Sequence, residues 1–509
     1  METSRVRDAV AGGASAAIAL GISELLAGLI SSVPSLVEGL GSWVIDNVPK
    51  PVKDWAIELF GTYDKLALLI GIALTTILIG ALIGVFARER FGLAVGVYVG
   101  FGVVAALAAA STSGASLGAA AVSAGAAVIA GLASLRGLYG LGERRPAEDG
   151  TDPSRRSFIL GASALMGLAA LTGVFGRSLI ERAKRAVSGR SEVVLPVAAE
   201  RLPPVPAAAE LGIDGLSPAI VPNEDFYRID TAFSVPQVDL ADWTLTIKGR
   251  VDKPYSISYY DLLDMRTVER DVTLSCVSND VGEGLVGNAR WQGVPLTEIL
   301  NRAGVRSDAE QIVGRSVDDF TVGFPVEAAY DGREALVAIG MNGEPLPFEH
   351  GFPARLVVAG LYGYVSATKW LSEIELTGWE EFDAYWIPRG WAKEAPIKTQ
   401  SRIDTPKHSR LIPPGPTSVA GVAWAPSRGI QKVEVQLGED APWQEATLSE
   451  ALSENSWVQW VIEWDAPDGT HDITVRATDG TGETQTSEKR PAAPSGATGW
   501  HSVSVFVEA

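Results

Sequence analysis

The sequence predicts a multi-domain protein with an all-α membrane domain of about five transmembrane helices, a central α+β domain and a C-terminal all-β domain. Three observations support this division. Long uncharged apolar runs are confined to the first third, short strand and helix patterns mix in the middle, and only strand patterns with regular turns follow. A chain of 509 residues has room for three or four domains.

Charge divides the chain in the same place. Residues 1–190 contain 17 Lys and Arg against 14 Asp and Glu, whereas residues 191–509 contain 25 against 47, a net charge of −22. Such an acidic surface repels phosphate, so a nucleic-acid-binding protein is excluded. The 14 Trp and 47% hydrophobic residues exclude a disordered chain. The single cysteine excludes an intrachain disulfide, a CxxC zinc or iron–sulfur site and a CxxCH haem attachment.

Four apolar stretches make residues 1–185 a membrane domain, because each is long enough to cross a bilayer. They are residues 9–37, 66–87, 91–135 and 157–176. The third is too long for one span and is broken at residues 111–114, so we expect two helices in a tight hairpin. The first is the weakest, because it contains Glu24 and Pro34. Together they predict five spans.

Lys and Arg favour the cytoplasmic side of a membrane and so predict the orientation. With five spans, the N-terminus lies in the cytoplasm and the acidic two thirds lie on the extracytoplasmic side of the cell membrane. Ser154-Arg155-Arg156 stands directly before the last span and resembles a twin-arginine signal, which exports folded proteins. Ordinary positive-inside anchoring is the alternative. The four histidines all lie outside the spans, which excludes a haem held there by two of them.

The acidic part divides into a linker and two domains. Residues 186–222 are rich in Pro and Ala and predict a linker that wraps onto the next domain. Residues 223–404 combine strand patterns with short helices, which predicts an α+β domain. Residues 405–509 show only strand patterns, with turn residues about every ten positions. About 100 residues with this spacing are typical of an immunoglobulin-like sandwich, here without a Cys pair.

The only thiol stands at the end of a predicted strand, in Thr273-Leu274-Ser275-Cys276-Val277. A lone Cys in an apolar strand is usually a small core residue. Five ordered blocks around it indicate another role. They are residues 223–228, 273–279, 287–296, 341–355 and 367–371.

This set of blocks resembles the sulfite oxidase family of molybdopterin enzymes. Residues 405–509 resemble the dimerisation domain that follows the molybdenum domain in this family, which implies a homodimer. The resemblance implies a molybdenum–molybdopterin cofactor with Cys276 as the metal ligand, and a soft thiolate suits that role. Further cofactor-binding residues are implied by position: Asn223, Phe226, Tyr227, Ser316, His350, Arg355, Ala367, Thr368 and Lys369. Tyr385 lies where the family places its active-site tyrosine, with Arg389 and Trp391 as pocket residues. A Tyr–Trp cluster of this kind is otherwise usually packing.

The substrate is less constrained than the cofactor. Sulfite follows from the resemblance, as does oxygen-atom transfer. Sulfite-oxidising members carry an arginine shortly after the ligand Cys, whereas this chain has Asp280 and Glu283, which we expect to repel an anion. Neutral substrates such as sulfoxides or N-oxides therefore remain an alternative, in which the enzyme would reduce its substrate instead of oxidising it.

No second redox centre is expected in the chain, neither haem nor iron–sulfur cluster. The electrons then pass to a separate carrier, a cytochrome or a quinone-linked protein. Two other readings remain: a non-catalytic binding module presented by the membrane domain, and a transporter fused to the enzyme. The scarcity of charged residues inside the spans disfavours the transporter.

Overall fold

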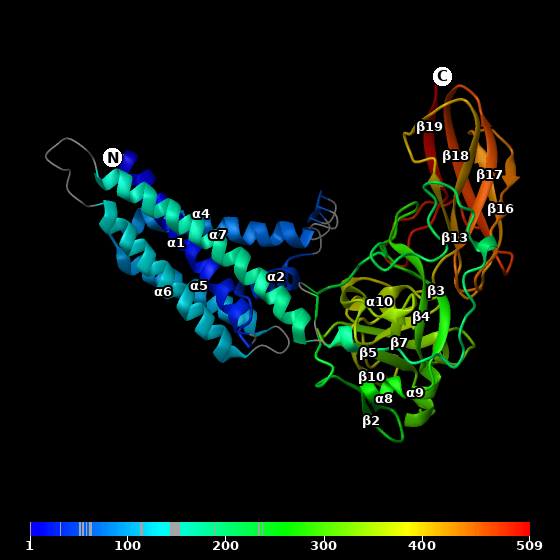
Figure 1. Cartoon of the computed structure of the whole chain (residues 1–509), viewed down its shortest axis with the longest axis horizontal. Coiled ribbons are helices and arrows are strands. Elements are labelled where there is room, and N and C mark those ends of the chain that lie inside the picture. Colours follow the sequence, from blue (N-terminus) through cyan, green and yellow to red (C-terminus); the bar gives the residue numbers. More distant parts are fainter. Residues whose placement is uncertain are drawn as a thin grey trace. The chain divides into compact units, whose positions relative to one another are not determined.

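Figure 1 shows a computed structural model of the chain, which divides into two compact units that are described separately below. Unit 1 comprises Met1–Ser188 and Ala232–Val235, and unit 2 comprises Gly189–Thr231 and Pro236–Ala509. The structure describes residues 2–30, 32–49, 52, 55, 56, 59, 60, 64–111, 116–142, 153–187, 189–232, 235, 236 and 238–508. Within these ranges, the side chains of residues 2–4, 46, 142, 153–155 and 181–187 are not described.

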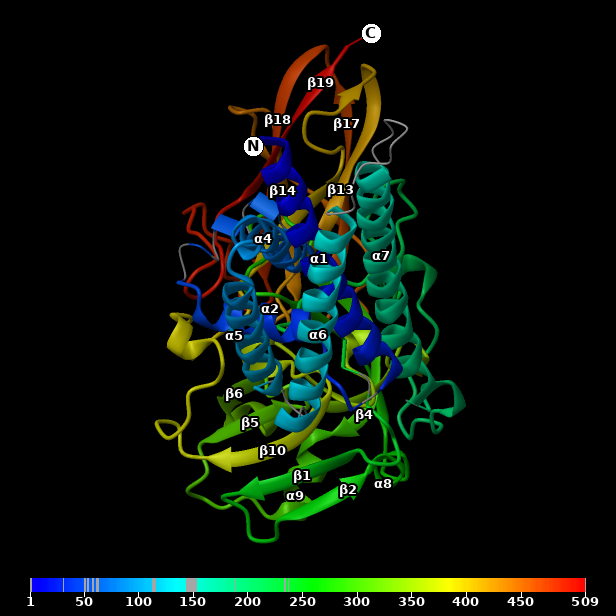
Figure 2. The same ribbon diagram turned by 90° about the vertical axis from the view of Figure 1, so that its left-hand side faces the viewer.

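Unit 1 is helical, and Figure 2 shows α5, α6 and α7 lying side by side. The helices of its described residues with assigned bounds are α1 (Glu2–Leu29), α2 (Leu36–Asn47), α4 (Asp64–Ala87), α5 (Phe91–Ala110), α6 (Leu117–Gly142) and α7 (Pro153–Val187). Among the described residues, 5 helices are long and apolar enough to cross a membrane, namely all of these except α2. The predicted run at residues 9–37 is split: α1 ends before Pro34, and Ser35 caps α2. Of the predicted break at residues 111–114, only Ser111 lies within the described residues.

Small residues allow α1 to pack closely against α4 and α7. A Cβ added at Gly12 would lie 2.0 Å from the carbonyl oxygen of Gly80, and one at Gly28 would lie 2.3 Å from that of Gly176. Larger side chains at these positions would push the helices apart.

Glu24 is buried in unit 1 but is not an isolated charge. Its Oε1 accepts a hydrogen bond of 2.6 Å from the Ser35 hydroxyl. Arg177 bridges two carboxylates, since its nitrogens lie 3.6 Å from Glu24 Oε2 and 2.9 Å from Glu38 Oε1. These contacts explain how an apolar helix tolerates a carboxylate near its end.

The first part of unit 2 is an α+β domain built on two sheets. One sheet has the order β2-β1-β10-β5-β6 and the other β3-β4-β7-β8, with β9 pairing with β7. All pairs are antiparallel except β1 with β10. The strands are β1 (Thr244–Gly249), β2 (Tyr255–Ser258), β3 (Val268–Ser275), β4 (Val286–Pro295), β5 (Gln311–Ser316), β6 (Thr321–Pro325), β7 (Ala335–Met341), β8 (Glu344–Pro345), β9 (Arg355–Val358) and β10 (Leu371–Thr377). The α-helices are α8 (Tyr259–Leu263), α9 (Leu296–Ala303) and α10 (Gly363–Ser366), and the 3-10 turns of unit 2 are η2 (Arg190–Glu192), η3 (Ala207–Ala209), η4 (Val326–Ala329), η5 (Phe348–His350) and η6 (Ile387–Arg389).

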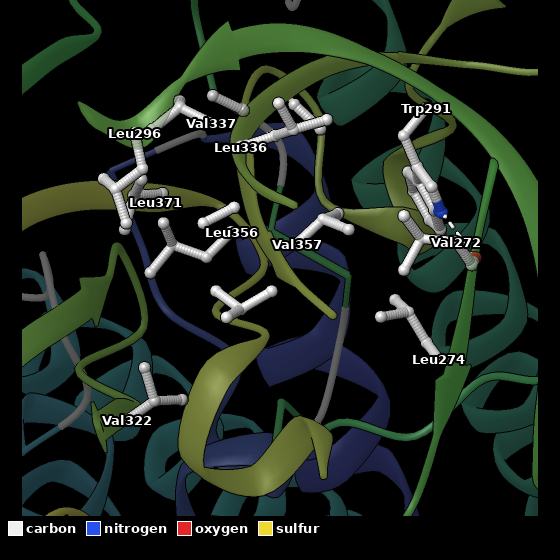
Figure 3. Close-up of a cluster of buried hydrophobic side chains, with 14 of the residues drawn as sticks. Val272, Leu274, Trp291, Leu296, Val322, Leu336, Val337, Leu356, Val357 and Leu371 are labelled. Carbon is white, nitrogen blue, oxygen red and sulfur yellow. Dashed lines mark hydrogen bonds between the residues drawn. The ribbon is translucent and has the colours of Figure 1, made fainter. Parts of the chain in front are cut away.

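The core of this domain lies between the sheets (Figure 3). Trp291 of β4 is fully buried there, and its indole N–H donates to the carbonyl of Val272 at 3.1 Å. Burial of such large side chains is the main stabilising contribution in a domain of this size. The core fixes β3, β4 and β9, whose ends carry the residues of the candidate site.

The C-terminal part of unit 2 consists of two sheets that share a second core. The orders are β11-β13-β17-β16 and β12-β19-β18-β14-β15. The strands are β11 (Gln400–Thr405), β12 (Leu411–Ile412), β13 (Gly415–Trp424), β14 (Ile430–Leu437), β15 (Trp443–Glu445), β16 (Thr447–Leu448), β17 (Val458–Ala466), β18 (Gly469–Asp479) and β19 (His501–Val507). Side chains from both sheets, such as Trp460 and Val475, meet in that core. This agrees with an all-β domain, while the immunoglobulin-like assignment stays a prediction.

Candidate functional site

A pocket in the α+β domain of unit 2 brings together many of the residues implied by the resemblance. About 920 Å³ of space unfilled by atoms, open solvent at its mouth included, lies within it. The predicted residues that line it are Phe226, Tyr227, Cys276, Ser316, His350, Arg355, Ala367, Lys369 and Trp391.

Cys276 directly follows β3 and is 8% exposed. Its backbone N–H donates to Leu285 at 2.9 Å, so the chain turns sharply behind the thiol before β4 begins. Burial raises the pKa of the thiol, so a metal would have to displace its proton. Among the described residues, no group of three or more His, Cys, Asp or Glu side chains could hold a metal ion. A metal bound at Cys276 would therefore take its other ligands from a cofactor.

Arg355, at the start of β9, is a buried cation. Its guanidinium donates to the carbonyl of His350 at 3.1 Å and lies 5.0 Å from the ring centre of Trp291. No ion pair joins it to a carboxylate of the described residues. Burial lowers the pKa of Arg355 to about 10. A buried guanidinium without a counter-ion is costly, and an anionic ligand would remove that cost.

Lys369 is the second cation of the pocket, and it has a partner. Its Nζ lies 2.8 Å from Asp230 Oδ2, which also lies 2.9 Å from Arg228 Nε. Burial lowers the pKa of Lys369 to about 8, against the opposing effect of Asp230. Gly351 packs against the base of both side chains: a Cβ there would lie 3.0 Å from the Cβ of Lys369 and 3.2 Å from the Cβ of Arg355. Its φ of +108° also favours glycine.

His350 and the 226–227 segment form the aromatic floor beside these cations. The Nε2 of His350 lies 2.9 Å from the carbonyl oxygen of Asn223, so Nε2 carries the proton. Burial lowers the pKa of His350 to about 4, and the ring is therefore neutral at pH 7. Phe226 packs edge-on against it at 5.5 Å and stacks on Tyr227 at 5.2 Å. Phe226 reaches this place because Gly287 of β4 leaves room, since a Cβ there would lie 2.8 Å from its ring.

Four residues that we predicted for the site do not line the pocket: Asn223, Thr368, Tyr385 and Arg389. The side chain of Asn223 bonds to Glu344 at 2.6 Å, and its backbone carbonyl holds His350. Thr368 is fully buried, with its hydroxyl oriented toward Gly314 of β5. The guanidinium carbon of Arg389 lies over the ring of Tyr385, 3.7 Å from the ring centre.

The expectation that Asp280 and Glu283 would face an anionic substrate is wrong. Both are exposed, and neither lines the pocket. The loop after Cys276 turns back toward β4 within a few residues, so these carboxylates lie outside. The carboxylates that do line the pocket are those of Asp230 and Asp318.

Four aromatic side chains form one wall of the pocket, and of these the sequence predicted only Trp391 as a pocket residue. We call these four residues, Phe320, Tyr364, Trp386 and Trp391, the aromatic wall. Trp391 lies 6.3 Å from Trp386 and 5.8 Å from Tyr364 between ring centres. Proximity to the five ordered sequence blocks was the available signal: Tyr364 precedes the 367–371 block, and Asp230 follows the 223–228 block.

Comparison with known proteins agrees with this geometry. A model described as the oxidoreductase molybdopterin binding domain matches residues 232–386, and one described as the Mo-co oxidoreductase dimerisation domain matches residues 392–508. Human mitochondrial sulfite oxidase is 27% identical over 302 residues, which cover 50% of this chain and 55% of the relative. An NADH nitrate reductase of Brassica napus is 27% identical over 316 residues, which cover 50% of this chain and 34% of the relative. The solved structure of the sulfane dehydrogenase SoxCD from Paracoccus pantotrophus is 23% identical, with a TM-score of 0.49, and covers 58% of this chain and 85% of that one.

In one pocket of this α+β domain lie a buried thiol and a buried guanidinium that has no carboxylate partner among the described residues. Together with the matched domain models and the curated relatives, they define a molybdopterin-dependent oxidoreductase. The chain belongs to the sulfite oxidase family of these enzymes. The chain spans about half the length of the curated sulfite oxidases it matches. Family membership disfavours the non-catalytic binding module.

Proposed function

We propose that this protein is a membrane-anchored molybdenum-cofactor oxidoreductase that transfers an oxygen atom to a small substrate, with sulfite as the first candidate. One observation carries the proposal: the only thiol of the chain shares a pocket with a buried guanidinium that has no counter-ion within the part of the chain that the structure describes. The sulfite oxidases among its relatives suggest the substrate.

The residues of the pocket fit a molybdenum–molybdopterin cofactor. The Cys276 thiolate is a soft ligand suited to the metal. The planar guanidinium of Arg355 suits the phosphate of the pterin. Lys369 adds a hydrogen-bond donor, and its positive charge is balanced by the carboxylate of Asp230. Neutral His350 and the Phe226 and Tyr227 rings offer a surface against which the pterin can lie.

When bound, the cofactor supplies the two-electron chemistry, in which sulfite and water become sulfate, two electrons and two protons. The protein binds and orients the cofactor through Cys276 and Arg355. The rings of the aromatic wall present apolar surface to the pocket, which would reduce the access of water to a bound cofactor. At pH 7 His350 is neutral and its Nε2 proton is committed to Asn223, so it positions the floor of the pocket.

The two electrons would pass to a separate carrier, a cytochrome or a quinone-linked protein. The charge of −22 on residues 191–509 favours a basic partner. The match to the dimerisation domain supports a homodimer. The twin-arginine-like motif and the five candidate spans support a multi-pass protein of the cell membrane with its catalytic domain on the extracytoplasmic side.

Reduction of sulfoxides or N-oxides is the second candidate. It is favoured by the aromatic wall, and by the two carboxylates, Asp230 and Asp318, that line the pocket. Such a lining suits a neutral organic substrate better than an inorganic dianion.

Metal analysis and substrate assays test both candidates. The purified full-length protein should contain about one molybdenum per chain, bound through the single thiolate ligand that the pocket offers. Steady-state rates with sulfite and with a panel of sulfoxides then decide between them. A chain without molybdenum after expression in a host that makes the cofactor would refute the proposal.

A further inference from the structure

The loop of residues 277–285 joins β3 to β4 and determines where the Cys276 thiol stands. The N–H of Cys276 donates to Leu285 at 2.9 Å, and the N–H of Asn279 donates to Cys276 at 3.1 Å. The buried Asn279 side chain accepts from the N–H of Leu285 at 2.7 Å. The base of the loop is thus closed on itself, and a shift of its outer part would be transmitted to Cys276.

Arg402 of β11 holds the outer part of this loop. Its Nη1 donates to the carbonyl oxygen of Glu283 at 2.8 Å. The guanidinium is fixed from its other side by Asp404 Oδ1 at 2.6 Å and by the Ser217 hydroxyl at 2.9 Å. Arg402 is only 8% exposed, so this hydrogen bond from a charged donor is protected from water.

His501, at the start of β19, covers the same loop at Gly282. Its Nδ1 accepts a hydrogen bond of 3.0 Å from the N–H of Ile403, which leaves the proton on Nε2. A Cβ added at Gly282 would lie 2.3 Å from Cδ2 and 2.4 Å from Nε2 of this imidazole. Gly282 also has a φ of +90°, a conformation that favours glycine.

We propose that Arg402 and His501 are positioning residues for Cys276, through which the C-terminal β-domain holds the loop that carries the metal ligand. Both residues belong to the C-terminal sheets, whereas Cys276 belongs to the α+β domain. The β-domain thus contributes to the metal site in addition to the dimer contact that its family description names. This inference rests on the proposed function, because it assigns a purpose to the fixed position of the ligand.

Thiol labelling in the cofactor-free, full-length protein tests the proposal directly. Cys276 is the only cysteine of the chain, so the rate of alkylation by iodoacetamide reports on this one position. Arg402→Gln should raise that rate about tenfold, because labelling follows local opening of the loop. Arg402→Lys should give an intermediate rate, because it keeps a cationic donor.

Arg428→Gln is the matched control. Arg428 forms a similar ion pair in the same β-domain, 2.8 Å from Asp479. Its other hydrogen bonds within the described part of the chain go to Ile397 and Thr399, outside residues 277–285. Its alkylation rate should equal that of the unchanged protein. Equal rates in Arg402→Gln and Arg428→Gln would overturn the proposal.

Gly282→Ala gives a second test if Arg402→Gln does not fold. It should raise the labelling rate, and adding His501→Ala should reverse part of the rise because the clash is relieved. Strictly additive effects would count against a role for His501.

Loading with molybdenum separates this inference from the proposed function. In the loaded protein, Arg402→Gln should shift the Mo(V) electron paramagnetic resonance signal, whereas Arg428→Gln should leave it unchanged. An unshifted signal would overturn the role at the metal site. A chain that never binds molybdenum would refute the proposed function, while the labelling experiment would still report whether the loop is held.

Discussion

Replacing Arg355 by methionine should stabilise the cofactor-free protein and abolish cofactor binding. The pKa of Arg355 falls to about 10 on folding, because burial disfavours its charge. Relative to an ordinary value of about 12.5, this difference corresponds to about 3 kcal/mol lost from the folded state at pH 7. The substitution removes that cost but also removes the hydrogen bonds to the carbonyls of His350 and Leu356, which together contribute about 1 kcal/mol. The net gain is about 2 kcal/mol, or a rise in Tm of about 5 °C.

The assay is thermal unfolding of the full-length, cofactor-free protein, followed by tryptophan fluorescence. Arg290→Met is the matched control, because Arg290 lies 2.8 Å from Asp271, whose side chain is 3% exposed. Loss of that arginine leaves a buried carboxylate unpaired and should cost about 3 kcal/mol. The two substitutions are thus expected to change Tm in opposite directions. If Arg355→Met lowers Tm as Arg290→Met does, the charge of Arg355 is compensated in the folded protein. The assignment of Arg355 to an anion-binding site would then be refuted.

Further predictions concern the other groups of the site. Cys276→Ser should abolish turnover, measured with saturating substrate, and retained activity in a molybdenum-loaded variant would contradict the ligand assignment. Asp230→Asn should destabilise the cofactor-free protein by about 3 kcal/mol in urea unfolding, because it leaves Lys369 buried without its carboxylate; an unchanged midpoint would contradict this. His350 and His501 both have a pKa lowered to about 4 in the folded state, so the unfolded state binds more protons between about pH 6.5 and 4 and stability should fall as the pH falls through that window. Replacing both by Phe should flatten this dependence, and an unaltered slope would refute its assignment. The rate of electron transfer to a basic cytochrome should fall as salt rises, and a salt-independent rate would argue against a partner selected by charge.

Much of the fold could be predicted because it depends on local patterns. Apolar runs of sufficient length identified the five candidate helices, and strand patterns identified the mixed domain at residues 223–404 and the all-β region that follows it. The first run was placed too far toward the C-terminus, because Pro34 and the capping Ser35 divide it into α1 and α2. A helix boundary set by one cap is difficult to read inside a continuous apolar stretch.

The candidate site was only partly predictable, because its decisive property is an absent partner. The sequence indicated the same role for Arg355 and Lys369. Among the described residues, only Lys369 contacts a carboxylate, that of Asp230, 139 positions away. The sequence also placed Asp280 near the thiol, whereas the turn after Cys276 directs it to solvent. Such differences depend on tertiary contacts, which spacing along the chain does not encode.

X-ray absorption at the molybdenum edge of the intact, loaded protein is the most direct test of the metal assignment. The account predicts a sulfur shell of about three neighbours, two from the pterin and one from Cys276, which falls to about two in Cys276→Ser. A spectrum without molybdenum, or a sulfur shell that is unchanged in Cys276→Ser, would contradict it.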